Sequence, residues 1–305
     1  MLYFVINPYA GSNDGQRIWK EVERILMERG EKYKCYRTKR PRDMVYLARK
    51  LTQGTTERRI VVVGGDGTIN EFLNGMLRVK NIKLGFIPVG SGNDFARGMK
   101  ISKDFKKELR KIISNKSCRN VDYGIIQYQN GKMHRFFVSS GMGYDARICY
   151  EADHTKIKQI LNFLHLGKLV YLLIGIRYLI FAETFSATLI VDDKRYLEGD
   201  GFLFVSFHNL PYEGGGFCFC PQAKTGDGKM NICVAKGIPK WRIPFIIPLA
   251  AIGRHTGCRG VYQFEFEQAK MIVPNGQYIH TDGEAKKNER NIQISVAKEK
   301  ILFMN

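Results

Sequence analysis

Glycine and acidic residues follow three strand-like segments early in the chain, in a pattern that suits phosphate chemistry. The segments end in Asn7-Pro8-Tyr9-Ala10-Gly11, Gly64-Gly65-Asp66-Gly67-Thr68 and Gly90-Ser91-Gly92-Asn93-Asp94. Glycine lets the backbone approach a ligand closely, and the free N–H groups at the start of a following helix attract phosphate. One such loop is usually only a turn, whereas three in succession predict a ligand site.

Two of these loops carry a carboxylate, Asp66 and Asp94, where a phosphate group would sit. A carboxylate repels a phosphate unless a cation lies between them, and Mg²⁺ binds one or two carboxylates together with phosphate oxygens. The pattern therefore predicts a Mg²⁺–nucleotide site. The P-loop motif G-x-x-x-x-G-K-[ST] is absent, and residues 141–146, although they match G-x-G-x-x-A, have no acid about 20 residues further on to hold a ribose.

The segments that must position these loops alternate between strand and helix patterns. Apolar runs predict strands at residues 2–7, 32–38, 58–63 and 83–89, and helical periodicity predicts helices at 17–29, 43–53, 70–78 and from Asp94 onward. This alternation predicts a doubly wound α/β domain, in which the carboxyl ends of the strands meet at one edge of a parallel sheet.

Strand patterns dominate after about residue 122. Strands are predicted at residues 122–128, 135–140, 185–191, 202–208, 230–236, 262–267, 270–274 and 291–296, with helical stretches at 155–181 and near 243–252. The sequence thus predicts an α/β domain over residues 1–122 and an antiparallel, β-sandwich-like domain over residues 123–305. The last strand is a candidate to pack back on the first domain.

The chain is strongly basic, with 48 Lys and Arg against 29 Asp and Glu and a formal charge of +19 over 305 residues. This charge suits nucleic acid, an anionic membrane or phosphate-bearing ligands, and a merely solvated basic surface is equally compatible with it. The 7 cysteines are scattered without a C-x-x-C pair, which predicts reduced thiols and a cytoplasmic location. No apolar run reaches the roughly 18 residues that a membrane-spanning helix needs.

Five motifs together resemble the diacylglycerol kinase catalytic domain. They are NPYAG at residues 7–11, GGDGTINEFLNG at 64–75, PVGSGNDFARG at 88–98, GMGYDA at 141–146 and HTDGEA at 280–285. In particular, the set looks like that of bacterial soluble diacylglycerol kinases and related lipid kinases. GGDGT alone is shared with NAD kinases, phosphofructokinases and sphingosine and ceramide kinases, whereas the GSGNDFAR loop is more particular to the lipid branch.

The resemblance implies an NAD-kinase-like first domain and transfer of the γ-phosphoryl group of ATP to a lipid hydroxyl, with diacylglycerol as the expected acceptor. It places Mg²⁺ at Asp66 and Asp94, and the acceptance of the hydroxyl proton at Asp282 or Glu284, with Glu284 as first choice. By itself, Asp282-Gly283-Glu284 would read as a surface turn. The implied ATP contacts are Asn7, Pro8, Tyr9, Ala10, Gly11, Thr38, Gly65, Asp66, Gly67, Thr68, Asn70, Glu71, Ser91, Gly92, Asn93 and Asp94.

The resemblance also implies a structural Mg²⁺ in the second domain. Asp227 would supply a carboxylate, and Lys224 and Lys229 would supply backbone carbonyls; an Asp-Gly turn without a cation is the alternative. Cys218 and Cys220, which with His208 could suggest a metal, are better explained as buried free thiols. The remaining histidines show no metal-ligand spacing, and a structural role is favoured for His280 beside the DGE motif.

Three functions compete. The first is a lipid kinase, acting on diacylglycerol or on another lipid alcohol such as a sphingoid base, ceramide, an isoprenoid or phosphatidylglycerol. The second is an NAD kinase, and the third is a non-catalytic basic protein that binds membrane or nucleic acid. We expect a lipid substrate at an anionic membrane surface, peripheral association with that membrane and no nucleic-acid partner. The sequence leaves the oligomeric state open, with a homodimer as one option.

Overall fold

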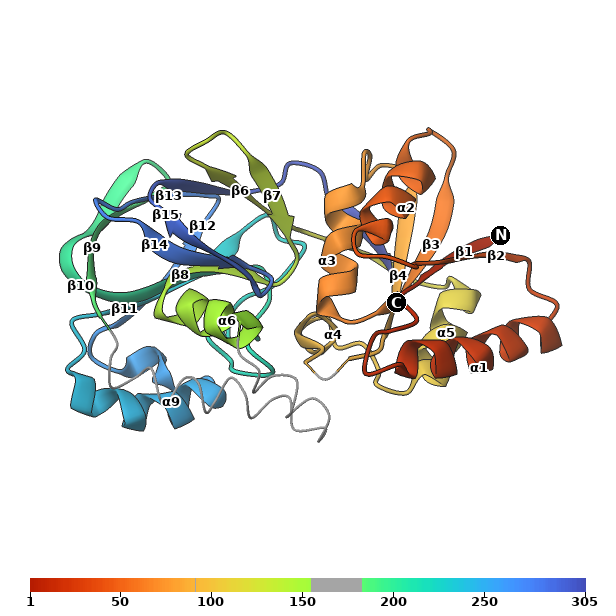
Figure 1. The fold of residues 1–305 in the computed structure, drawn as a ribbon, viewed down its shortest axis with the longest axis horizontal. Coiled ribbons are helices and arrows are strands. Elements are labelled where there is room, and N and C mark those ends of the chain that lie inside the picture. The colour runs from red at the N-terminus through yellow and green to blue at the C-terminus, as the bar shows by residue number, and fades with distance from the viewer. Residues whose placement is uncertain (91, 155–182) are drawn as a thin grey trace. The chain divides into compact units, whose positions relative to one another are not determined.

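The chain forms two compact units in the computed structural model, which describes residues 1–90, 92–154 and 183–305. The first unit comprises Met1–Asp122 and Lys298–Asn305, and the second comprises Tyr123–Ala297. Each unit has its own sheet and its own apolar core (Figure 1). Two predictions, the helix at residues 155–181 and the ATP contact Ser91, lie outside the described residues.

A six-stranded sheet in the order β2-β1-β3-β4-β17-β5 forms the centre of the first unit. Every neighbouring pair is parallel except β17 and β5, which are antiparallel. The final strand of the chain therefore lies in the sheet of the first unit. The strands are β1 (Leu2–Ile6), β2 (Tyr33–Arg37), β3 (Arg58–Gly64), β4 (Ile82–Pro88), β5 (Cys118–Val121) and β17 (Ile301–Met304).

Helices cover both faces of this sheet, as the doubly wound prediction requires. Trp19 of α1 and Ile112 of α5 pack in one buried cluster with Phe4 and Val61 of the sheet, while α2 and α3 lie on the other side (Figure 1). Because both faces are covered, β3 is apolar and buried from Ile60 to Gly64, after two half-buried arginines at its start. The helices are α1 (Asp14–Glu28), α2 (Asp43–Thr52), α3 (Asp66–Gly75), α4 (Asp94–Gly98) and α5 (Phe105–Ser114).

Helix α3 begins at Asp66, four residues before the predicted start at residue 70. Glycine is a poor helix former, so the run around Gly67 suggests a loop. In the structure Gly65 is extended and its carbonyl accepts the Ile69 N–H at 3.1 Å, so the helix starts directly after β3. The prediction of a longer loop was wrong, and the glycine-rich motif forms the first turn of the helix.

The second unit is built on an antiparallel sheet of 11 strands, which confirms the predicted sandwich-like class. The strands are β6 (Gly124–Tyr128), β7 (Met133–Phe136), β8 (Ser139–Gly143), β9 (Phe185–Val191), β10 (Lys194–His208), β11 (Met230–Lys236), β12 (Val261–Phe266), β13 (Gln268–Ile272), β14 (Gln277–Thr281), β15 (Glu284–Glu289) and β16 (Ile292–Val296). The helices are α6 (Tyr144–His154) and α9 (Ile243–Ala251), with single 3₁₀ turns at Lys240–Arg242 and His255–Gly257.

Strand β10 is twice as long as predicted and connects two parts of the sheet. Its first half pairs with β9, and its end pairs with β8 and β11. The register shifts between Gly199 and Phe202, where Gly199 and Gly201 have φ values of 92° and 86°. Such bulges bend a strand, so the sheet curves around a core that includes Phe207, Ile232 and Phe266.

The predicted strand at residues 135–140 is two strands, β7 and β8, separated by a corner at Phe137 and Val138. The N–H groups of both corner residues donate to the carboxylate of Asp282 instead of to a neighbouring strand. A side chain some 145 positions along the chain thus interrupts the ladder, and no local pattern reports that contact.

Candidate active site

The loops that follow the parallel strands of the first unit start at one edge of its sheet. Strand pairing continues beyond the strand ends, because the N–H of Asn7 donates to Val63 O at 3.0 Å and that of Val89 donates to Gly64 O at 2.7 Å. On the other side of β1, the Thr38 N–H donates to Ile6 O at 2.9 Å. The loops after β1, β2, β3 and β4 are therefore held side by side.

Asn7 connects the first loop to the start of α3. Its Nδ2 donates to Thr68 Oγ1 at 3.2 Å, and its Oδ1 accepts the Tyr9 N–H at 3.1 Å. Thr68 packs so closely over the end of β3 that a Cβ on Gly64 would lie 2.5 Å from it. A glycine at that position allows the helix to begin immediately above the strand.

A pocket of about 290 Å³ lies at this edge of the first unit. Four of its lining residues are predicted ATP contacts, and the other four were not predicted. The predicted residues are Asn7, Tyr9, Thr38 and Glu71, and the others are Lys39, Arg40, Pro41 and Met44. The structure thus brings residues from three separate motifs around one cavity. It also places two cationic residues, Lys39 and Arg40, in the lining.

Asp43 orders the basic part of that lining. Its Oδ2 accepts the Lys39 N–H at 2.7 Å and the Arg40 N–H at 2.9 Å, and these backbone hydrogen bonds lower the pKa of the Asp43 carboxyl. The sequence showed a basic stretch around YRTKR, but charge alone does not say which cations turn toward a cavity.

Asp66 joins the loops that follow β3 and β4. Its Oδ2 and Oδ1 accept the N–H groups of Asp94 and Phe95, each at 3.0 Å, so it caps the start of α4. The Asp94 carboxylate is paired with Arg97. Each carboxylate oxygen has two acceptor positions, so these bonds are compatible with a cation, and an all-oxygen donor set is what Mg²⁺ prefers. Asp66 and Asp94 therefore fit the predicted ion.

In the second unit, Asp282 and Gly283 form the two-residue turn between β14 and β15. Their φ values of 47° and 86° match a type I′ hairpin turn, for which Asp-Gly is a preferred pair. The Asp282 carboxylate accepts three N–H groups, from Phe137 and Val138 at 2.8 Å and from Ser139 at 3.0 Å. Glu284 is the first residue of β15 and is exposed. The two predicted bases therefore have different surroundings.

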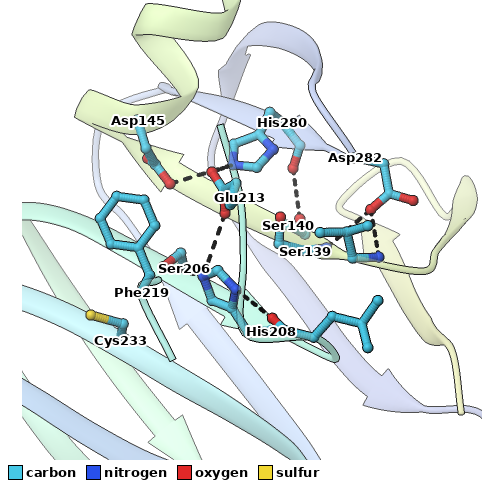
Figure 2. Close-up of polar contacts among 12 residues, drawn as sticks. Ser139, Ser140, Asp145, Ser206, His208, Glu213, Phe219, Cys233, His280 and Asp282 are labelled. Atoms are coloured by element: carbon cyan, nitrogen blue, oxygen red, sulfur yellow. Dashed lines mark hydrogen bonds and ion pairs between the residues drawn. The ribbon is translucent and has the colours of Figure 1, made fainter. Parts of the chain in front are cut away.

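A buried polar cluster lies behind this turn (Figure 2). The His280 Nε2 is 3.1 Å from Glu213 Oε1 and 3.4 Å from Asp145 Oδ2, and the His280 backbone carbonyl accepts from Ser140 Oγ at 2.7 Å. His208 Nε2 lies 3.4 Å from the second Glu213 oxygen. Figure 2 shows Asp145 and Glu213 turned toward the His280 ring. The sequence analysis missed Glu213, whose only signal is its position before three glycines.

The cluster carries charge although it is buried. Burial alone would raise the pKa of Glu213, but the His280 and His208 rings outweigh it and lower that pKa to about 2. Burial opposes protonation of His280, yet Glu213 and Asp145 raise its pKa well above the usual value. Burial raises the pKa of Asp145. We therefore describe Glu213 and His280 as an ion pair, with the Asp145 carboxyl group beside it.

The same three side chains are the described residues with metal-ligand geometry. Asp145, Glu213 and His280 each offer one ligand atom, and these atoms lie within 4.8 Å of one another. A Cβ on Gly141 would lie 2.0 Å from Asp145 Oδ2 and 2.6 Å from His280 Nε2, so a glycine is required where they converge. A cation bound there would compete with the proton of the His280 ring.

Cys218, Cys220 and His208 do not form a metal site of their own. The two cysteines are free and buried, and burial raises the pKa of both thiols. Their thiolate forms are therefore disfavoured, and thiolate is the form that binds metal. His208 turns instead toward Ser206, at 3.0 Å, and toward Glu213. This arrangement agrees with the prediction of buried free thiols.

The predicted structural Mg²⁺ loop is a tight, exposed turn. Asp227 Oδ1 accepts the Lys229 N–H at 3.0 Å, and Lys229 Nζ lies 3.4 Å from Glu265 Oε2. Lys224 and Asp227 line the same turn. These contacts describe an Asp-Gly turn that closes on its own backbone, and Mg²⁺ at Lys224, Asp227 and Lys229 stays a prediction.

Comparisons with known proteins agree on one family. A family model for the diacylglycerol kinase catalytic domain matches residues 1–126, and a model for the YegS C-terminal NAD kinase beta sandwich-like domain matches residues 138–296. The chain is 30% identical over 288 residues to "Putative lipid kinase YtlR" of Bacillus subtilis, covering 92% of each chain. It is 25% identical to a diacylglycerol kinase of Staphylococcus epidermidis, covering 92% of this chain and 84% of that protein.

Solved structures show the same fold. A diacylglycerol kinase from Bacillus anthracis matches with a TM-score of 0.73 and 20% identity, over 99% of this chain and 96% of that one. An NAD kinase from Archaeoglobus fulgidus in complex with ATP matches with a TM-score of 0.53 and 12% identity, over 100% and 94%. The family models and the curated relatives place the chain in the lipid kinase family. More particularly, the chain belongs to the diacylglycerol kinase family.

Within the described ranges, no helix has the length and hydropathy to cross a membrane.

Exchanging Asp282 for Asn should destabilise the second unit by about 2 kcal/mol, because an amide NH₂ would then face a backbone N–H that loses its acceptor. The matched change Glu284→Gln, two residues away on an exposed side chain, should alter stability by less than about 0.5 kcal/mol. Urea unfolding of both variants measures the difference. Equal effects would mean that Asp282 does not hold the β7–β8 corner.

Exchanging Glu213 for Gln should make the free energy of unfolding fall less steeply as the pH is lowered. The lowered pKa of Glu213 makes a contribution to stability that is present above about pH 4.5 and lost as the pH falls toward 2. Urea unfolding between about pH 7 and pH 3 should therefore show a shallower decline in the variant, from a lower starting value. Glu265→Gln, which changes an exposed ion-pair partner of Lys229, should retain the native slope. Parallel curves for all three proteins would refute the ion pair.

Proposed function

We propose that the chain transfers the γ-phosphoryl group of ATP to the hydroxyl of diacylglycerol and so forms phosphatidic acid. The observation that carries this proposal is the pocket of the first unit, where Asn7, Thr38 and Glu71 surround a cavity that Lys39 and Arg40 also line. The relatives that are named diacylglycerol kinase support the choice of acceptor.

The first unit supplies the features that nucleotide binding needs. Lys39 and Arg40 offset the negative charge of a triphosphate, and the glycine loops let backbone N–H groups reach it. Asp66 and Asp94 would hold Mg²⁺, which neutralises phosphate charge when it is bound. Phosphoryl transfer depends mostly on positioning and on such neutralisation, so these residues account for most of the expected catalysis.

Glu284 is the better candidate for the base. The carboxylate of Asp282 already accepts three backbone N–H groups, which favours a structural role. Glu284 is exposed at the end of a turn that Asp282 and the buried His280 cluster hold in place. A rigid turn that presents one exposed carboxylate suits a group that must accept a proton from a bound hydroxyl.

Membrane association follows from this proposal, since diacylglycerol is found in bilayers. The net charge of +19 supports an anionic membrane surface as the partner, and we infer peripheral association from the cytoplasmic side. The NAD kinase alternative and the other lipid alcohols become arms of the test.

The test is transfer of label from γ-labelled ATP with Mg²⁺ in mixed micelles. Diacylglycerol, ceramide, a sphingoid base, an isoprenoid alcohol, phosphatidylglycerol and NAD are offered separately. We expect label in phosphatidic acid, and a rate lowered by a factor of about 10² to 10⁴ in Glu284→Gln. Glu289→Gln, at the far end of the same strand, should retain full activity.

Other outcomes separate the alternatives. Label in a different lipid would keep the kinase and change its substrate, and label in NADP would replace the proposal with an NAD kinase. Full activity in Glu284→Gln would exclude this residue as the base. Absence of transfer to every acceptor would reject the proposed function.

A further inference from the structure

Helix α9 and the turn before it present apolar residues to solvent. Trp241, Phe245 and Ile252 are 71%, 70% and 63% exposed, and Pro244 and Pro248 lie between them in the sequence. Pro244, Phe245 and Pro248 lie along one side of α9, while Trp241 lies in the 3₁₀ turn before the helix and Ile252 directly after its last residue. We call these five residues the α9 apolar face. A surface helix normally shows the reverse pattern, with polar residues on its exposed side.

The opposite side of α9 already packs on the second unit. Ile243 lies in a buried cluster with Leu203 and Ala235, and Ala250 is also buried. The apolar face is therefore not needed to attach the helix to its own sheet. A contiguous exposed patch of this kind marks an interaction site more often than a scatter of single apolar residues does.

The charges around α9 indicate which partner covers it. Residues 236–264 contain Lys236, Lys240, Arg242, Arg254 and Arg259 and not a single Asp or Glu. Lys240 is exposed, and the guanidinium of Arg242 lies 6.0 Å from the centre of the Trp241 ring. Tryptophan favours the membrane–water interface, and Lys and Arg are attracted to anionic headgroups. An apolar face whose neighbours in the sequence are basic and never acidic complements an anionic bilayer.

The length of the helix restricts how it can meet a bilayer. Helix α9 spans 9 residues, far fewer than the roughly 20 that crossing the hydrocarbon core requires. It can instead lie in the plane of the interface, with its apolar side among the acyl chains and its cations at the headgroups.

We propose that the α9 apolar face docks the chain on the surface of an anionic lipid bilayer. Trp241 and Phe245 enter the interface, while Lys240, Arg242 and Arg254 contact the headgroups. This inference deepens the proposed function, on which it rests for its biological purpose, because a kinase for diacylglycerol must take its substrate from a membrane. The docking itself requires neither ATP nor catalysis.

The first experiment measures binding of the full chain to sedimenting vesicles of phosphatidylcholine with phosphatidylglycerol. The double variant Trp241→Ser/Phe245→Ser should bind at least about tenfold more weakly, since two large apolar side chains no longer leave water. The matched control Met27→Ser/Tyr46→Ser removes side chains that are 66% and 63% exposed on helices of the first unit, and it should bind like the native chain. Equal binding by both double variants would overturn the proposal.

The native tryptophans provide a second readout. The chain has 2 tryptophans, of which Trp19 is fully buried and Trp241 is exposed. A change in tryptophan fluorescence on membrane binding therefore reports on Trp241. Brominated phosphatidylcholine mixed with phosphatidylglycerol should quench part of the fluorescence, and the Trp19 part should remain. Vesicle binding without quenching would show that another surface docks, and this would overturn the proposal.

A second copy of the chain is the competing partner for the α9 apolar face, and sedimentation velocity without lipid tests it. If the native chain forms a dimer that the Trp241→Ser/Phe245→Ser exchange dissociates, and vesicle binding is unchanged, the proposal is overturned.

Phosphoryl transfer to short-chain diacylglycerol in detergent should be unchanged in the double variant. Native binding through α9 without phosphorylation of any lipid would retain the docking surface and reject the kinase function.

Discussion

The parallel pairing of β1, β2, β3 and β4 is the constraint on which the candidate site of the first unit depends. Parallel strands end at a common edge, so every loop that follows them opens there, and α3 and α4 begin within a few residues of that edge. Backbone hydrogen bonds continue beyond the strand ends to Asn7 and Val89, and they fix the positions of the loops along the strand direction relative to one another. Motifs far apart in the chain thereby become neighbours around one pocket.

The two units stabilise their carboxylates differently. In the first unit Asp66 bonds the backbone N–H groups of the next loop, and Asp43 bonds those beside the pocket. The second unit uses backbone N–H groups at Asp282 but charged side chains deeper inside, where Glu213 and His280 pair in the core. Breaking a buried pair of this kind is costly, because one uncompensated charge remains. The DGE turn is therefore rigid on its inner side and exposed at Glu284.

The sequence was most informative where a short pattern has one structural meaning. Apolar runs located β1, β3 and β4, and glycine with an acid located the loops at their ends. It was least informative where a contact joins distant positions. The corner at Phe137 depends on Asp282, and the buried cluster depends on Glu213. The late start predicted for α3 has a local cause, since glycine propensity is overridden by packing against β3.

The central claim is that nucleotide binds at the sheet edge of the first unit. A crystal structure of the chain with Mg²⁺ and a non-hydrolysable ATP analogue tests it most directly. The account predicts the triphosphate in the pocket lined by Asn7, Thr38, Lys39 and Glu71, with the metal ion at the carboxylates of Asp66 and Asp94. Nucleotide bound elsewhere with this pocket empty, or a metal ion away from both carboxylates, would contradict it.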